Sequence, residues 1–119
     1  MHELLLVEDH PLLRAATALA LRREDFVVHA AGGAAEALEL LAAHPAVAAA
    51  LLEIELGHGG PDGFAFAAAA RALRPGLAIV FLTGRADLLV GRVPGAGEAH
   101  LVKPCPVAHV AETIRRMIR

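Results

Sequence analysis

The sequence contains a single cysteine, Cys105, and no serine, asparagine, glutamine, tryptophan or tyrosine. One cysteine cannot form an intramolecular disulfide, and it cannot supply the several thiolates of a cysteine-rich zinc site. No apolar run reaches the ~20 residues that span a bilayer, and the first residues lack the basic segment of a signal peptide. We therefore expect a protein of the reducing cytoplasm that has no membrane partner.

The sequence also lacks a large excess of charge of either sign, because it has 11 lysines and arginines and 13 aspartates and glutamates, for a formal net charge of -2. Such a chain has no basic field to hold a nucleic-acid backbone, so no direct nucleic-acid binding is expected. With 119 residues, 56% of them hydrophobic, the chain suits one domain over residues 1–119 with a buried core. Its only lysine, Lys103, either serves a specific role or persists by chance on a solvated surface.

Short apolar runs alternate with segments of helical periodicity along the whole chain. The runs are typical of strands buried on both faces, and the periodic segments are typical of amphipathic helices. The predicted strands are residues 3–7, 26–30, 46–52, 77–82 and 99–102, and the predicted helices are 11–23, 34–43, 64–73, 86–92 and 106–118. The helix at 86–92 is weak because Gly91 and Pro94 interrupt it, and 57–63 is predicted to be a glycine-rich loop.

Five strand–helix units with short connections predict a single doubly wound α/β domain, in which a five-stranded parallel sheet carries helices on both faces. In such sheets ligands bind beyond the carboxyl ends of the strands. The residues at these ends are therefore the candidate site, and they are Glu8 and Asp9 after the first strand, Glu53 and Glu55 after the third, Thr83 and Gly84 after the fourth, and Lys103 after the fifth.

Three carboxylates at one edge, those of Glu8, Asp9 and Glu53, would repel one another unless a cation lies among them. Mg²⁺ prefers a few carboxylates, carbonyl oxygens and water, so a divalent site is the economical interpretation. The Thr83 hydroxyl and the Lys103 ammonium are groups suited to bind a tetrahedral phosphoryl group. The alternative is that all five are ordinary polar residues at strand ends.

Five short motifs occur in this order along the chain: LLLVEDHP, LLEIEL, PDGF, IVFLTG and LVKP. In this order and spacing they resemble the receiver domain of two-component response regulators over essentially the whole chain. The resemblance implies a CheY-like, flavodoxin-like fold and Mg²⁺-dependent transfer of a phosphoryl group from a kinase histidine to an aspartate at the end of the third strand. It also implies a sensor histidine kinase or histidine phosphotransfer protein as donor and an effector protein as target. A homodimer is further implied, through the face of residues 86–92, 99–102 and 106–118.

The resemblance assigns metal binding to Glu8 and Asp9, with Asp9 as the direct ligand. The family's third-strand carboxylate, at the position of Glu53, belongs to the same metal site. Glu55 matches the position that offers a backbone carbonyl to the metal.

Three further positions carry the family's phosphate contacts and switch. Thr83 matches the switch hydroxyl, and Lys103 matches the lysine that contacts the phosphate, followed by Pro104, where the family often has a cis bond. His100 stands in place of the switch aromatic residue, although a histidine at a strand end is more often a simple surface residue.

Glu53 departs from the family, because it occupies the position of the phosphoacceptor aspartate. Its extra methylene extends the carboxylate by about 1.5 Å, and in-line transfer is sensitive to a displacement of that size. We predict that Glu53 is a poor or silent acceptor whose carboxylate reaches toward Lys103 and Thr83. It could hold the domain in an active-like, phosphomimetic state, mark a receiver that signals without phosphate, or be an engineered substitution.

A small metal-dependent phosphohydrolase with an acid-lined α/β fold is the alternative function. Against it, Glu8-Asp9-His10 lacks the Asp-x-Asp pattern of such enzymes, and no segment could form a cap over a substrate. We therefore expect a signalling module and not an enzyme. The histidines show no HxxxH or HExxH spacing, so no zinc site is expected, and Cys105 is expected to pack against the last helix.

Overall fold

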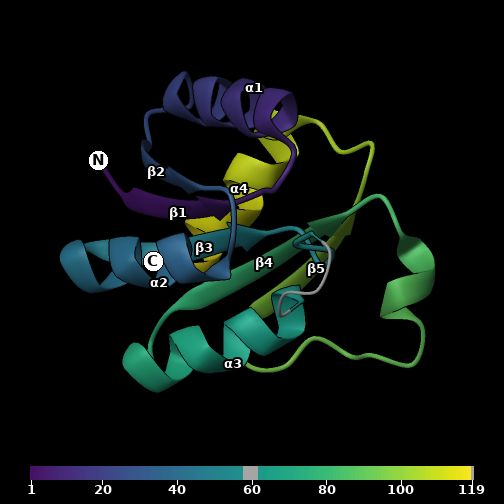
Figure 1. Ribbon diagram of the computed structural model, residues 1–119. Helices are drawn as coiled ribbons and strands as arrows, with labels where there is room; N and C mark the ends of the chain where they lie inside the picture. The colour runs from purple at the N-terminus through teal and green to yellow at the C-terminus, as the bar shows by residue number, and fades with distance from the viewer. Residues whose placement is uncertain (58–61, 119) are drawn as a thin grey trace.

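The computed structural model describes residues 1–57 and 62–118, and within them one parallel sheet is covered by helices on both faces (Figure 1). The strands are β1 (Glu3–Val7), β2 (Val27–Ala31), β3 (Val47–Leu52), β4 (Ala78–Thr83) and β5 (Glu98–Val102). The helices are α1 (Pro11–Arg22), α2 (Ala34–Ala43), α3 (Gly63–Leu73), the 3₁₀ helix η1 (Ala86–Leu89) and α4 (Val107–Met117).

The strand order is β2-β1-β3-β4-β5, and every neighbouring pair is parallel. The chain passes outward from β1 to β2, then returns across β1 to β3 and continues outward to β5. This reversal creates a topological switch point between β1 and β3, where a doubly wound sheet opens a crevice at its carboxyl edge. The predicted fold class is thereby confirmed.

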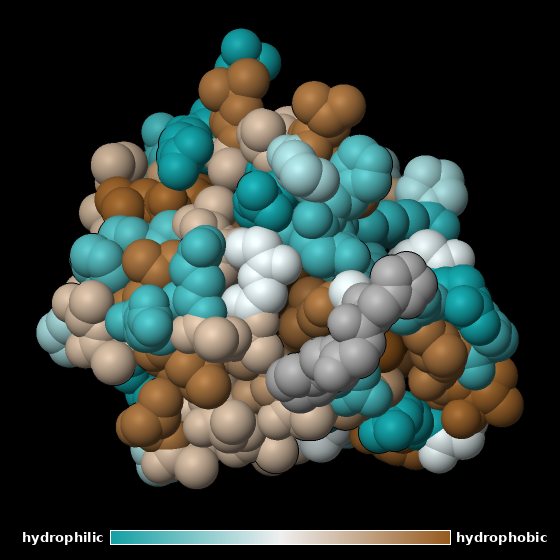
Figure 2. Space-filling view, viewed as in Figure 1, coloured by the Kyte–Doolittle hydropathy of each residue, from teal (hydrophilic) through white to brown (hydrophobic). Residues whose placement is uncertain are grey.

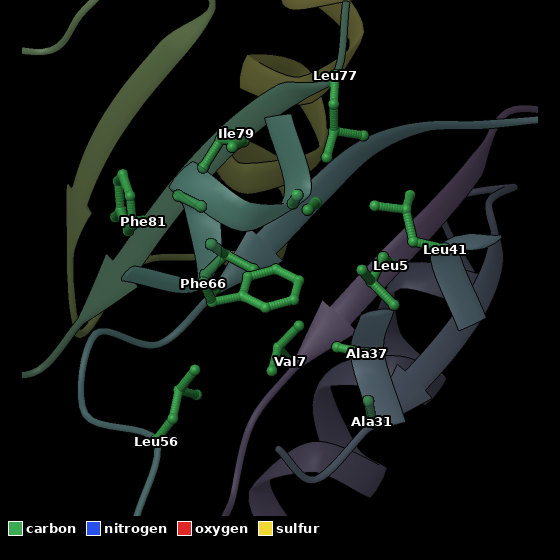
Figure 3. Packing of buried hydrophobic residues seen from close by; sticks show 14 of the residues in the cluster. Leu5, Val7, Ala31, Ala37, Leu41, Leu56, Phe66, Leu77, Ile79 and Phe81 are labelled. Carbon is green, nitrogen blue, oxygen red and sulfur yellow. The ribbon is translucent and has the colours of Figure 1, made fainter. Parts of the chain in front are cut away.

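Helices α1 and α4 cover one face of the sheet, and α2 and α3 cover the other (Figure 1). Successive strand residues alternate between the two cores, so Leu5 and Val7 pack on the α2–α3 side and Leu4 and Leu6 on the α1–α4 side. Figure 3 shows the ring of Phe66 from α3 lying among side chains of β4 and β1. Burial on both faces explains why the strands are continuous apolar runs and not alternating ones.

Two helices begin with the side-chain caps that their sequences favour. The Nδ1 atom of His10 accepts a hydrogen bond from the Leu13 N–H at 3.3 Å, with Pro11 in the first turn of α1. The Asp62 carboxylate accepts one from the Ala65 N–H at 2.8 Å at the start of α3. Both caps satisfy backbone donors that a helix leaves unpaired.

One predicted element is wrong, because the helix expected over 86–92 is a single 3₁₀ turn, η1. Gly91 and Gly97 adopt positive φ values of 77° and 73°, which a right-handed helix does not allow, and Pro94 lies between them.

The other elements agree within one or two residues, and Cys105 packs against the α1–α4 core as expected. Of the predicted loop at 57–63, residues 58–61 lie outside the described residues and Gly63 belongs to α3. No helix in the described part of the chain is long and apolar enough to cross a membrane.

Gly63 fixes the approach of α3 to the end of β3. Its N–H donates to the Ile54 carbonyl at 2.6 Å, and a Cβ at this position would lie 2.5 Å from the Glu53 carbonyl oxygen and 2.9 Å from the Ile54 Cα. Because both obstacles are backbone atoms, neither can turn aside as a flexible side chain would. The first residue of α3 thus has to be glycine for the helix to dock beside Glu53.

We expect Gly63→Ala to lower the free energy of unfolding by about 1–3 kcal/mol, as overpacking of a close contact does. Gly76→Ala is the matched control, because a Cβ at Gly76 meets nothing within 4 Å. Urea unfolding of both variants and the parent measures the difference. Equal stability of the two variants would contradict the close approach of α3 to β3.

Candidate functional site

The backbone ladder of the sheet continues past the strand ends and fixes the residues of the site. The Glu8 N–H donates to the Ala31 carbonyl at 3.1 Å, and the Glu53 N–H donates to the Val7 carbonyl at 3.1 Å. The Lys103 N–H donates to the Thr83 carbonyl at 2.8 Å. Side chains that are up to 95 residues apart in the sequence therefore start from neighbouring, rigid positions on one edge.

The Lys103 ammonium group lies at the centre of this edge. Its Nζ donates to Glu53 Oε2 at 2.9 Å and to Glu8 Oε1 at 3.2 Å. The exposed fractions of the side chains are 27% for Lys103, 11% for Glu53 and 8% for Glu8. The pairs are thus largely shielded from water, where loss of Lys103 would be costly because two carboxylates would stay buried without their shared cation.

Glu8 is the most buried carboxylate of the site. Its Oε2 accepts the His10 N–H at 3.3 Å, and its backbone carbonyl accepts a hydrogen bond from the Arg14 guanidinium at 2.9 Å. Burial raises the pKa of Glu8 above 4.5, and this effect exceeds the lowering by the His10 N–H and by Lys103. Burial alone would lower the pKa of Lys103, but the hydrogen bonds and charges of Glu53 and Glu8 raise it.

Both carboxylate oxygens of Glu53 are engaged, because Oε1 accepts the Ile54 N–H at 3.2 Å while Oε2 accepts from Lys103. Thr83 is fully buried, and its Oγ1 accepts the Arg85 N–H at 3.0 Å. Among the described residues no hydrogen bond joins Glu53 to Thr83. Of the two contacts predicted for the Glu53 carboxylate, the structure contains the one with Lys103.

Glu55 and Asp9 lie on the exposed rim of the site. The Glu55 carboxylate accepts a hydrogen bond from Arg85 at 2.8 Å, and the same guanidinium donates to both oxygens of Asp87 at 2.9 and 2.7 Å. The hydrogen bond from Arg85 lowers the pKa of Asp87. The sequence analysis missed two arginines of the site. The only sequence feature that pointed to Arg85 was its position two residues after Thr83, and no sequence feature pointed to the contact of Arg14 with Glu8.

His100 lies away from the acidic edge, in a separate hollow. Its ring meets Phe81 edge-on with centroids 5.6 Å apart, and the Arg92 guanidinium lies 3.5 Å above the Phe64 ring. These side chains line a cavity of about 390 Å³ between α3, β4 and β5. The Lys103–Pro104 peptide bond, by contrast, belongs to the acidic edge and is cis.

The sequence model of the response regulator receiver domain matches residues 4–115 of this chain. The chain belongs to this family. A comparison with curated proteins found no match.

Solved receiver structures share the fold at low sequence identity. The response regulator TrrA from Thermotoga maritima, crystallised with Mg²⁺ and BeF, has a TM-score of 0.85 at 21% identity, and the match covers 98% of this chain and 99% of that one. A CheY-like receiver from Methanospirillum hungatei JF-1 gives 0.81 at 24% identity, with 99% and 94% covered. The receiver domain of the hybrid histidine kinase CckA gives 0.82 at 22% identity, with 98% and 99% covered.

The donor set of this receiver domain fits a hard divalent cation. The carboxylates of Glu8 and Glu53 contact the ammonium group of Lys103, and the neighbouring Asp9 carboxyl contributes to the raised pKa of Glu8. A further positive charge would offset this excess of carboxylates, and oxygen donors are the ligands that Mg²⁺ prefers. The residues at this edge are therefore of the types that could hold a divalent cation.

The raised pKa of Glu8 predicts a pH dependence of stability. Protonated Glu8 makes a favourable contribution to the free energy of unfolding. This contribution is fully present below pH 4.5 and is lost as the pH rises through the raised pKa. Ionised Glu8 therefore costs stability at neutral pH without a divalent cation. We expect Glu8→Gln to raise the melting temperature at about pH 7 in EDTA, with a difference that shrinks below about pH 4.

Thermal unfolding followed by circular dichroism across this pH range makes the measurement. Glu39→Gln is the control, because Glu39 is an exposed carboxylate on α2, and its melting temperature should follow the parent at every pH. A Glu8→Gln variant that is less stable than the parent at neutral pH would show that the hydrogen bonds of Glu8 outweigh its burial.

Proposed function

We propose that this receiver domain works through protein contacts while Glu53 stands as a silent residue at the acceptor position. The observation that carries the proposal is the engagement of both Glu53 oxygens, one by Lys103 and one by the Ile54 N–H. An acceptor must present a carboxylate oxygen in line with the donor, and a shift of about one C–C bond disrupts such an arrangement. Glu53 instead uses its longer reach to neutralise the lysine that would bind the phosphoryl oxygens.

The same contacts favour silencing over activation. A phosphoryl group carries about two negative charges and three acceptor oxygens, whereas a carboxylate carries one charge. Here the carboxylate satisfies Lys103, but the Thr83 hydroxyl is bonded to the Arg85 N–H. Glu53 thus replaces the phosphoryl group at the lysine and not at the threonine, so we infer that it does not set the switch.

In a variant with aspartate at position 53, this edge would support transfer. Glu8, Asp9 and the Glu55 carbonyl would hold Mg²⁺, which supplies positive charge to the phosphoryl oxygens. Lys103, released from Glu53, would bind one phosphoryl oxygen, and the Thr83 O–H would donate to another while its oxygen continues to accept from the Arg85 N–H. The phosphohydrolase alternative gains no support, because the family model that matches residues 4–115 is that of the response regulator receiver domain.

The partners follow from the family and from the altered output side. We infer a sensor histidine kinase or histidine phosphotransfer protein as the upstream partner, and a protein effector or second copy on the face of η1, β5 and α4. Because η1 is short, Val90 and Val93 after it are 79% and 85% exposed, and Figure 2 shows apolar surface grouped over this segment. The reducing cytoplasm is the compartment in which such a module would act.

Incubation with acetyl phosphate and Mg²⁺, read by intact mass, tests the proposal. We expect Glu53→Asp to gain one phosphoryl group and the parent to gain none. The double variant Glu53→Asp, Asp9→Asn is the control, because it keeps the acceptor and loses the metal ligand, and it should stay unmodified.

The possible outcomes separate the components of the proposal. Labelling of the parent at Glu53 would overturn the silent acceptor. Absence of labelling in Glu53→Asp, with unchanged melting behaviour, would show that Arg85 and the shortened η1 prevent transfer as well, and would leave a purely phosphate-independent module.

A further inference from the structure

A second group of ligating side chains lies at the opposite edge of the sheet. It consists of Glu3 at the start of β1, His29 in β2 and His44 directly after α2, and one ligand atom of each lies within 4.8 Å of the others. The His29 Nε2 is 2.8 Å from Glu3 Oε1. The two imidazole rings are stacked, with centroids 3.8 Å apart and planes at 19°.

The fold brings these residues together from three elements. Glu3 pairs with Val27 in the β1–β2 register, which places His29 two residues further along β2 on the same face of the sheet. Helix α2 covers that face, and its C-terminal end, which His44 follows, lies at the left of Figure 1 near the start of β1. The cluster therefore has two ligands on rigid strands and one at a helix end.

Arg74 holds the segment that carries His44. Its guanidinium donates to the carbonyl of Leu41 at 2.7 Å, to that of Val47 at 2.9 Å and to that of His44 itself at 3.2 Å. These bonds fix the backbone between α2 and β3, so the His44 side chain alone is left to adjust. A preorganised backbone of this kind lowers the cost of assembling a binding site.

We propose that Glu3, His29 and His44 bind a zinc ion or a similar late transition-metal cation. Two imidazole nitrogens and one carboxylate oxygen form a donor set that suits Zn²⁺, Cu²⁺ or Ni²⁺, with water in the remaining position. All three residues are partly exposed, so an ion and its water can reach them. The set is unsuited to Mg²⁺, which prefers oxygen ligands.

The ring nitrogens and the carboxylate of the cluster would have to give up their present contacts to coordinate a metal. A neutral imidazole ring carries a lone pair on one of its two nitrogens, and this lone pair can coordinate a cation. A metal bound between His29 Nε2 and Glu3 Oε1 would replace the hydrogen bond that joins these atoms, and a proton on Nε2 would move to Nδ1 of the same ring or to solvent. Because stacked rings direct their lone pairs nearly parallel, the His44 ring turns out of the stack to complete the site.

This site is independent of the acidic edge and of the proposed function. The two sites lie at opposite ends of strands of five to six residues, and a strand rises about 3.3 Å per residue, so roughly 16 Å of sheet separates them. A metal here would link the starts of β1 and β2 to the end of α2. Because it binds the folded state, it would stabilise the domain.

Zinc titration of untagged, chelator-treated protein near pH 7 tests the proposal, with excess Mg²⁺ present to fill the oxygen-rich edge. Calorimetry is expected to show one Zn²⁺ per chain, and thermal unfolding a rise of several degrees in melting temperature. His44→Gln and Glu3→Gln should each weaken binding at least tenfold and abolish the rise. Aromatic proton NMR of the parent should show the His29 and His44 ring signals shift together as the stack opens.

Two further variants locate the binding. His109→Gln removes an exposed imidazole from α4, and Asp9→Asn changes the acidic edge; both should retain the parent's zinc affinity. Parent-like zinc binding by His44→Gln and Glu3→Gln would place the metal elsewhere and overturn the proposal. So would the absence of any binding or stabilisation by Zn²⁺ in the parent, whatever the result of the phosphorylation experiment.

Discussion

The structure of the functional edge depends on one ammonium group placed between two carboxylates where parallel strands end. Parallel strands all finish at the same edge, and their backbone bonds continue to Glu8, Glu53 and Lys103. Charges brought this close and this far from water must compensate one another. Lys103 therefore decides what its neighbours can do, since each bond that it makes to Glu53 is unavailable to an incoming anion.

In the proposed function, a single methylene at position 53 changes the chemistry of this edge without changing its charge. Glutamate at position 53 reaches the lysine, whereas the buried Thr83 hydroxyl is held by the Arg85 N–H. Arg85 in turn connects Glu55 to Asp87 on η1, so the acidic edge and the shortened output segment share one guanidinium. The segment after β3 and η1 are thus physically connected through Arg85.

The two edges of the sheet differ in the chemistry of their donors. Oxygen donors and a lysine collect where the strands end, and imidazoles collect where β1 and β2 begin. Hard and borderline cations would consequently separate between the edges, because ligand type, more than overall charge, selects the metal. One small domain can in this way carry a signalling edge and a stabilising edge that do not compete.

The sequence alone determined the sheet, most helices and the residues of the acidic edge, because unbroken apolar runs identify buried strands and the polar residues that follow them must share one edge. It did not predict that η1 is a 3₁₀ turn, since positive φ at Gly91 and Gly97 becomes visible only in the folded backbone. It also missed Arg85 and the group of Glu3, His29 and His44. Those contacts depend on strand register and on where α2 ends, and histidine spacing along a chain carries no information about distances across a sheet.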